Sequence, residues 1–432
     1  CDRESDPAVA VKWFTQGDSS MTSLRNPGAR TVAQSVGVAL LSAGAVSTAL
    51  AEESVRSFEF YGFAQADYIQ DISGRLDPEW DDAFRPSKIC FDGACGEDGQ
   101  ASLSVKQSRF GVKGTMPTKG EGGIPLNFKF EFDLFGTGVD AGQTTMRLRH
   151  FYGEWGQILA GQTNSLFMDI DVFPNTIDYW GPSGMVFYRN VQIRWTPYKT
   201  ENSHFAIAIE RPGNDIDDGS IRTIEELEDV EVRNDEELPD LTAQFRYGGD
   251  WGHLQLGGIL RKVGYELRAD PADSWTEGDE VGWGINVGTV FNVLEKDAIR
   301  LQVVYGEGIA SYMNDGGMDL APSADWDAGI VTDLEAEAVP LMGVLAYYDH
   351  WWNDKWSSSI GYSFTEVDNT NFQDPGAFQK IDYASGNVLY YPAENLMVGA
   401  ELMWGERTNN DDASEDNVRF QFTVKYNFGI TL

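Results

Sequence analysis

The sequence predicts an all-β fold, a transmembrane antiparallel β-barrel of about 16 strands, and three observations support this fold class. Apolar and polar residues alternate with a period of two in many segments. Short links between these segments alternate with long links rich in Asp and Gly. Beyond the N-terminal region, no stretch is apolar enough for a membrane helix, which needs roughly 20 such residues. A mature chain of roughly 380 residues, at roughly 23 per strand and loop, gives the strand number.

The alternation is clearest at the C-terminus, in VRFQFTVKYNFGITL. From Val418 to Leu432 the apolar residues occupy one face of an extended strand and the polar residues occupy the other. The segments SFEFYGFAQADY and LNFKFEFDLF follow the same rule. In a membrane barrel the apolar face contacts lipid and the polar face lines the lumen. We therefore expect the last strand to close the barrel.

The lengths of the links favour a membrane barrel over a soluble β-sandwich. Outer-membrane barrels have short periplasmic turns and long extracellular loops, whereas a sandwich has no reason for this asymmetry. Short links are predicted at GGDWG (248–252) and VLEK (293–296). Long links are predicted at about 71–102, 165–189, 212–238, 264–280, 310–336 and 405–417.

The N-terminal region predicts export. From Met21 the chain reads MTSLRNPGARTVAQSVGVALLSAGAVSTALAEES, with two arginines, a short apolar core and the small-residue cleavage site Ala49-Leu50-Ala51. This pattern predicts a signal peptide over residues 21–51 and a mature barrel domain over residues 52–432. Residues 1–20 precede this methionine and resemble over-extended translation or a vector remnant, so they are left out of the fold prediction.

Composition excludes several classes of function. The net charge of −36 argues against nucleic-acid binding. The four histidines are scattered, and the chain has no HExxH, GxSxG or P-loop motif, so we expect no catalytic residue, metal or cofactor. Of the three cysteines, only Cys90 and Cys95 are close enough to pair locally.

The segment TTMRLRHFYGEWGQILAGQTNS predicts the functional site. Met146 and Leu148 share one strand face, so Arg147 and Arg149 share the other. A guanidinium facing lipid at mid-depth costs about 2–4 kcal/mol, so both arginines should point into the lumen. The same parity argument places further cations on the lumen wall: Arg109, Lys113, Lys129, Arg194, Arg246, Arg261, Arg300, Arg419 and Lys425. Fixed cations in a narrow aqueous pore favour anions.

Some of these cations are expected to pair with lumen acids as structural struts. We expect Arg147 and Arg149 to be the least easily neutralised. The loop SLFMDIDVFPNTIDYWGPSGMVFYRN (165–190) is far more apolar than the other long links, which predicts that it folds inward as a constriction loop. Asp169, Asp171 and Asp178 would then face the arginines. Packing between subunits is the competing explanation for its aromatic residues.

Four segments carry a resemblance to a known family: FYGFAQADY, QSRFGVKG, MRLRHFYGEWGQILAGQTNSLFMD and NTIDYWGPSGMVFYRNVQIRWTP. They resemble the DcaP-like family of trimeric Gram-negative outer-membrane porins. The resemblance implies a 16-stranded barrel, a homotrimer in outer-membrane lipid and lipopolysaccharide, and diffusion of small anionic solutes such as dicarboxylates. The family's positively charged constriction maps onto Arg147 and Arg149.

The leading hypothesis is therefore a passive outer-membrane porin with no reaction and no cofactor. The alternative is a secreted, salt-adapted, β-rich carbohydrate-active enzyme with a pair of catalytic carboxylates. A barrel with a lumenal enzyme lacks a Ser-His-Asp arrangement, and the chain is too short for a larger barrel with a plug domain.

Overall fold

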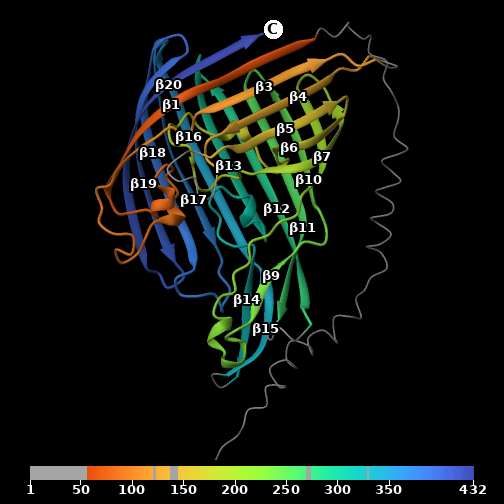
Figure 1. The fold of residues 1–432 in the computed structure, drawn as a ribbon, viewed down its shortest axis with the longest axis vertical. Helices are drawn as coiled ribbons and strands as arrows, with labels where there is room; N and C mark the ends of the chain where they lie inside the picture. The colour runs from red at the N-terminus through yellow and green to blue at the C-terminus, as the bar shows by residue number, and fades with distance from the viewer. Residues whose placement is uncertain (1–55, 120–122, 137–144, 269–273, 328–329) are drawn as a thin grey trace, which may run out of the picture.

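The computed structural model describes residues 56–119, 123–136, 145–268, 274–327 and 330–432, and the predicted signal peptide lies outside these ranges. The main sheet has 18 strands, of which β2 (Ala101–Ser104) pairs only with β1 and β9 (Glu231–Asp235) only with β11. The other sixteen strands close into an antiparallel barrel, which confirms the predicted fold class (Figure 1).

The wall strands follow one another around the barrel in chain order. They are β1 (Ser57–Ser73), β3 (Arg109–Met116), β4 (Leu126–Asp133), β5 (Arg147–Trp155), β6 (Ile158–Asn164), β7 (Arg189–Lys199), β8 (Ser203–Glu210), β10 (Asp240–Gly249), β11 (Gly252–Arg268), β12 (Thr276–Val293), β13 (Asp297–Glu307), β16 (Pro340–Asn353), β17 (Trp356–Val367), β18 (Phe378–Ala393), β19 (Leu396–Asn409) and β20 (Ser414–Thr431). The loops contain a hairpin of β14 (Leu320–Asp327) and β15 (Ile330–Ala338) and short 3-10 helices: η2 (Pro78–Trp80), η3 (Pro86–Lys88), η4 (Ile170–Val172), η5 (Ile221–Thr223), η6 (Glu225–Leu227) and η7 (Ala310–Tyr312).

The last strand closes the barrel, as its alternation predicts. β20 pairs with β1 over a long register that begins at Glu59↔Thr431. At the end of this seam, the amide of Phe58 donates to the carbonyl of Leu432 at 3.1 Å, and the amide of Leu432 donates back at 2.8 Å. Closure leaves no unpaired edge in the wall, which is the condition for a β-structure to cross a membrane.

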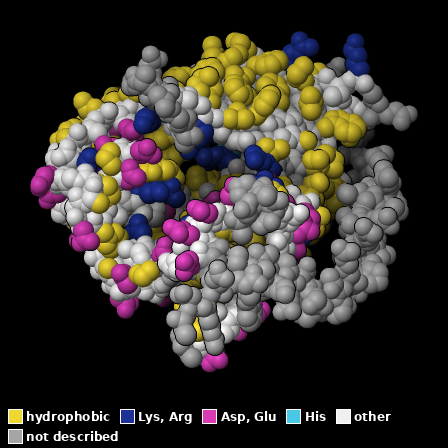
Figure 2. All heavy atoms as spheres, turned by 60° about the horizontal axis from the view of Figure 1, so that its bottom comes forward, with side chains coloured by type: hydrophobic (Ala, Val, Ile, Leu, Met, Phe, Trp, Pro, Cys, Tyr) yellow, Lys and Arg dark blue, Asp and Glu magenta, His cyan; other side chains and the backbone are white. Residues whose placement is uncertain are grey.

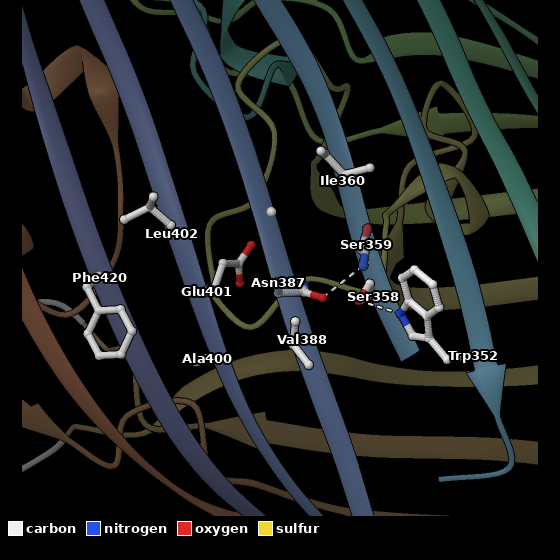
Figure 3. A pocket seen from close by; sticks show the side chains of 11 residues that line it. Trp352, Ser358, Ser359, Ile360, Asn387, Val388, Ala400, Glu401, Leu402 and Phe420 are labelled. Carbon is white, nitrogen blue, oxygen red and sulfur yellow. Dashed lines mark hydrogen bonds between the residues drawn. The ribbon is translucent and has the colours of Figure 1, made fainter. Parts of the chain in front are cut away.

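The wall is apolar outside and polar inside. On β11, Leu254 and Leu256 are 46% and 49% exposed, whereas the intervening His253 and Gln255 are 5% and 2% exposed. Figure 3 shows the outer surface of β17 to β20, where Ile360, Val388, Leu402 and Phe420 line a shallow recess of about 450 Å³ with Trp352 beside them. A soluble protein has the reverse distribution, with apolar residues inside and polar residues outside. The observed distribution is that of a barrel whose outer surface contacts lipid.

The two ends of the barrel differ. At one end the turns are short, including those predicted at 248–252 and 293–296. Exposed aromatic side chains gather there, among them Trp155, Tyr198, Trp251, Trp352 and Trp356. The other end carries the long loops, and β9, β14 and β15 project beyond it, at the bottom of Figure 1. We call these the short-turn end and the long-loop end.

Two of the predicted long links are wrong. Most of 264–280 belongs to β11 and β12, and most of 405–417 belongs to β19 and β20, which are separated only by residues 410–413. In both places the strands continue past the apolar band as a paired hairpin. The exposed residues of these hairpins are polar. The alternation of apolar and polar residues is therefore lost, although the strands remain paired.

Loops fill much of the barrel interior. Residues 165–188, here called the inner loop, pack with the loop residues Phe84 and Tyr312 against lumen-facing side chains such as Leu341 and Tyr383 in one large buried cluster. The prediction that this loop folds inward is confirmed. Among the described residues, no helix is long and apolar enough to cross a membrane. Cys90 and Cys95 form a disulfide, a pairing that the sequence left open.

Candidate functional site

Six cationic side chains lie on one side of the lumen, and we call this set the basic wall. Its members come from four strands: Arg109 on β3, Lys129 on β4, Arg147 and Arg149 on β5, and Arg189 and Arg194 on β7. Five of them were predicted from strand parity, and Arg189 was not. Only two carboxylates, those of Glu131 and Asp133 on β4, lie within 4.0 Å of these cations among the described residues.

A β-bulge on β5 increases the density of the basic wall. Glu131 pairs with His150 and Phe132 pairs with Leu148, so Arg149 is an extra residue without a partner on β4. A bulge lets two residues occupy the space opposite one and redirects their side chains. Arg149 and His150 are both buried as a result. Phe151 then returns to the outer face, where it is 62% exposed.

Glu131 and Asp133 hold the arginines of β5 in place. The Arg149 guanidinium donates to Glu131 at 2.8 Å and to Asp133 at 2.9 Å. Arg147 donates to both oxygens of Asp133, at 3.1 and 2.7 Å. The expectation that Arg147 and Arg149 would be the least neutralised cations is therefore wrong. Their counter-charges are the carboxylates of Glu131 and Asp133, which lie two positions apart on β4 and face the lumen.

Lys129 and Arg109 share Glu131 with Arg149. The Lys129 ammonium lies 3.3 Å and the Arg109 Nε 3.7 Å from Glu131 oxygens. The second of these distances is too long for a hydrogen bond. One carboxylate thus serves three cations, and the group as a whole retains positive charge. Lys113 lies beyond this group and pairs with Glu59 at 3.0 Å.

Arg189 and Arg194 contact neutral groups only. Arg194 donates to Gln192 Oε1 at 2.9 Å and to the carbonyl of Asn164 at 2.8 Å. Arg189 lies 3.5 Å from the Tyr179 hydroxyl, and its Nη1 is buried without a hydrogen-bonding partner. Within the described part of the chain, no carboxylate comes within 4.0 Å of either guanidinium.

Tyr179 of the inner loop joins three of these arginines. Its hydroxyl accepts hydrogen bonds from Arg147 and from Arg149, the latter at 2.9 Å, and donates to Asp133 at 3.2 Å. Its ring stacks on Phe135 with centroids 4.1 Å apart. Sequence parity cannot find Tyr179, because it lies on an irregular loop that only the folded structure brings to the wall.

Asp178 is directed away from the arginines, contrary to the prediction. Its carboxylate accepts the backbone amides of Phe84 at 2.9 Å and of Trp180 at 2.7 Å. Burial raises the pKa of this carboxyl. Its neighbours are amides rather than guanidinium groups, so Asp178 shapes the loop and does not face the basic wall.

Asp169 and Asp171 contact a cation on β10, two strands beyond β7 and outside the basic wall. Arg246 on β10 lies 3.4 Å from Asp169 and 2.5 Å from Asp171, and His253 on β11 lies 2.7 Å from Asp169. The oxygens and nitrogen of this group are close enough to hold a metal ion. The Arg246 guanidinium already offsets the carboxylate charge, so the group acts as a fastening of the inner loop.

The remaining predicted lumen cations are mostly struts, as expected. Arg261 lies 3.2 Å from Asp319, Arg300 lies 2.6 Å from Asp349, and Arg419 lies 2.7 Å from Asp71. Lys425 lies 3.9 Å from the centre of the Phe63 ring. The Arg261 pair connects a loop to the wall, whereas the Arg300 and Arg419 pairs connect neighbouring wall strands. Each paired charge contributes little to the field in the lumen.

Charge is distributed differently at the mouth. Figure 2 looks toward the long-loop end, where Lys and Arg side chains gather in a hollow and Asp and Glu side chains lie to the left of it and below it. A solute entering from this end therefore passes an acidic rim before it reaches a basic interior. This arrangement can attract, orient and release an anion without forming a covalent bond.

Comparisons with known proteins agree with this geometry. The family model "DcaP outer membrane protein" matches residues 47–428. The outer membrane channel DcaP of Acinetobacter baumannii is similar in structure, with a TM-score of 0.70 and 23% identity over 88% of this chain and all of that one. The trimer form of OmpT from Vibrio cholerae has a TM-score of 0.51 and 13% identity, over 87% of this chain and all of that one.

An anion-selective porin from Comamonas acidovorans has a TM-score of 0.53 and 10% identity, over 87% of this chain and all of its own length. No curated protein sequence matches the chain significantly. The matches and the apolar outer surface favour an outer-membrane channel over the secreted enzyme. The family model spans most of the chain, and the chain therefore belongs to the DcaP outer membrane protein family.

Proposed function

We propose that this protein is an outer-membrane porin that favours small anions, and that the basic wall sets this preference. One observation carries the proposal: on one side of the lumen, four of the six cationic side chains share two carboxylates, and the other two contact neutral groups only. The small hydrophilic solutes expected to benefit most are dicarboxylates, because their two charges can contact successive cations along the wall.

The physical argument is electrostatic. Low-dielectric walls focus the field of fixed charges into an aqueous pore and raise the local concentration of counter-ions. Arg189 and Arg194 offer donors whose charge no carboxylate within 4.0 Å offsets, among the described residues. The inner loop spans the lumen, from β12 and β19 to the basic wall, and so narrows the path of a passing solute beside these donors. Selectivity by rings or rows of charge is the usual device of such pores.

Assembly and export complete the proposal. One similar structure is described as a trimer and another as anion-selective, and these descriptions support a homotrimer and an anion preference here. We infer that residues 21–51 are cleaved as a signal peptide and that the long-loop end faces the exterior, in contact with lipopolysaccharide. Migration of the detergent-extracted protein before and after heating tests the trimer, and N-terminal sequencing tests the cleavage.

The test of selectivity is the reversal potential of single channels in a planar bilayer under a KCl gradient. The wild type should be anion-selective. The Arg147→Gln/Arg149→Gln variant leaves Glu131 and Asp133 without these partners, so its reversal potential should move toward that of a cation-selective pore. A cation-selective wild type would contradict the proposal.

A further inference from the structure

A pocket of about 710 Å³ lies at the long-loop end, outside the basic wall, and we call it the vestibule pocket. It forms where the η3 segment, residues 315–318, the link from β17 to β18, and the end of β19 meet. Its lining includes Arg85, Ser87, Lys88, Asn369, Phe378 and Arg407. Its volume is in the range of small-molecule sites.

We propose that the vestibule pocket binds organic anions that combine a carboxylate, an amide or hydroxyl group and an apolar body. It would hold such a solute at the mouth, before the solute reaches the basic wall. This inference rests on the proposed anion-selective porin and identifies a class of solute for it.

Two cations of the pocket are available to a carboxylate. Arg407 donates to Asn409 Oδ1 at 2.9 Å and to the carbonyls of Ser87 at 2.8 Å and Gly376 at 3.1 Å. These acceptors are neutral, and no carboxylate of the described residues lies within 4.0 Å of Arg407 or Lys88. Charge-assisted hydrogen bonds to a ligand carboxylate are stronger than bonds between neutral groups.

The third cation of the pocket, Arg85, is held in a fixed position by two aromatic rings and a carboxylate. Arg85 lies beside the rings of Trp80 and Trp180, which contact each other edge to face, and its guanidinium is 4.6 and 4.8 Å from their centres. Its Nε donates to Asp315 at 3.0 Å, and the amide of Ser87 donates to the other oxygen of Asp315 at 3.0 Å. Asp315 is thus occupied from within the protein, and it fixes the η3 segment.

The other two acids lining the pocket are also occupied. Asp217 accepts the amide of Gly219 and the side chain of Gln373, each at 2.8 Å. Asp374 accepts the hydroxyl of Ser220 at 2.6 Å. These carboxylates stabilise the loops around the pocket, so the groups left for a ligand are mainly donors.

Unpaired polar atoms beside the pocket indicate a ligand more directly. Both the oxygen and the nitrogen of the Asn369 side-chain amide are buried without a hydrogen-bonding partner, and so is the hydroxyl of Ser87. Buried polar groups in folded proteins are nearly always paired, so an unpaired amide and hydroxyl lining one pocket need an explanation. A ligand amide could donate to Asn369 and accept from it, and Ser87 could serve a second polar group.

The apolar part of the lining completes the pattern. Phe378, Val367 and Val339 line the pocket from the barrel rim, and Met318 lies near them. Phe378 packs against the large buried cluster, which fixes this surface. An apolar or aromatic group of the solute would rest here while its carboxylate meets Lys88 and Arg407. Few precisely placed polar groups on an apolar surface are typical of small-molecule sites.

The test uses N-benzoylglycine (hippurate), which has a benzoyl ring, one amide and one carboxylate. Isothermal titration calorimetry on the full-length barrel in detergent should detect binding to the wild type. Asn369→Leu and Lys88→Gln should each weaken it, by about tenfold for the loss of the paired amide and about threefold for the loss of the charge. The neutral analogue hippuramide should bind about tenfold more weakly than hippurate.

Lys355→Gln is the matched control, because it removes the same charge from the exposed turn between β16 and β17 at the opposite end. It should bind hippurate as the wild type does. Lys88→Gln keeps the test decisive if Asn369→Leu fails to fold. Absence of hippurate binding to the wild type, or equal binding by wild type and both pocket variants, would overturn the proposal.

Arg189→Gln separates this inference from the proposed function. It should shift the reversal potential of the channel and leave the hippurate affinity as it is. Loss of hippurate binding in Arg189→Gln but not in Asn369→Leu would place the site at the basic wall and overturn the vestibule proposal alone. A cation-selective wild type that binds hippurate through Asn369 would overturn the proposed selectivity and retain the pocket.

Discussion

The two sides of the barrel interior are built in different ways. On the side of β3 to β7, six cationic side chains lie on the wall, and only two carboxylates lie within 4.0 Å of any of them among the described residues. On the side of β11 to β19, loops pack against the wall as a hydrophobic core that includes Phe167, Tyr312 and Tyr383. The comparison shows that the two sides have different roles. The side of β3 to β7 provides an electrostatic field in the lumen, and the loops packed on the side of β11 to β19 provide a rigid surface.

The side of β11 to β19, here called the filled side, also holds the backbone of the inner loop through hydrogen bonds. Gln255 donates to the carbonyl of Met168 at 2.9 Å, and Asn286 donates to that of Phe167 at 2.8 Å. Glu401 accepts the amides of Ile177 and Asp178, the latter at 3.0 Å. A loop held through its main chain at several points keeps a fixed shape. The position of Tyr179 among the arginines depends on this fastening.

The largest effect is expected from removing a carboxylate of the basic wall. In Asp133→Asn, Arg147 and Arg149 lose a shared counter-charge at a fully buried position. Leaving a buried charge without its partner costs about 3–5 kcal/mol, so the free energy of unfolding in urea should fall by about that amount. Asp354→Asn, which breaks an exposed pair with Lys296, should have little effect. Equal effects of the two variants would show that the basic wall is as solvated as the exterior.

A smaller loss of stability is expected on the filled side. Glu401→Ala leaves two inner-loop amides without an acceptor, which costs about 1–3 kcal/mol. Because the loop is then less firmly held, single-channel recordings should show a noisier current than in the wild type. Glu406→Gln, on the same strand, provides the control. A quiet channel in Glu401→Ala would mean that hydrophobic packing alone holds the loop.

A third prediction concerns the field rather than the stability. Arg189→Gln removes one charge that no carboxylate within 4.0 Å offsets, among the described residues. A unit charge ~6 Å from a passing ion is worth roughly 0.7 kcal/mol at the dielectric of water, with opposite sign for chloride and potassium, so the chloride-to-potassium permeability ratio should fall about tenfold. Arg222→Gln, which removes a paired charge from the rim, should leave the ratio nearly unchanged.

The smallest effect is expected at the disulfide. Cys90 and Cys95 close a short local loop next to η3. Because this loop is outside the wall and outside the inner loop, Cys90→Ser/Cys95→Ser should conduct with unchanged selectivity. A shift in the reversal potential of this variant would mean that the η3 region controls the current.

Strand parity predicted most of the barrel and part of the site. Alternation alone placed Arg147 and Arg149 in the lumen, because each strand has only two faces. It missed Arg189, which is the first residue of β7 and has the parity of the outward-facing Val191. At the end of a strand, the adjoining loop sets the direction of a side chain, rather than the pairing of the strands. The sequence therefore contained no local signal for this residue.

Contacts between distant segments were the other limit. The pairing of Arg147 with Asp133 depends on the register of β4 and β5, and the bulge at Arg149 changes that register by one residue. One partner of Asp178, the amide of Phe84, comes from a separate loop. Periodicity reports the face of a residue but not its height along the barrel, so it cannot predict which charges meet.

The most direct test of the account compares the reversal potentials of two variants with that of the wild type under one KCl gradient. Arg189→Gln/Arg194→Gln neutralises the unpaired cations of the basic wall, and Glu228→Gln/Asp229→Asn neutralises two acids of the long-loop end. The account predicts an anion-selective wild type, a clear loss of selectivity in the wall variant and little change in the rim variant. A rim variant that changes selectivity more than the wall variant would contradict it.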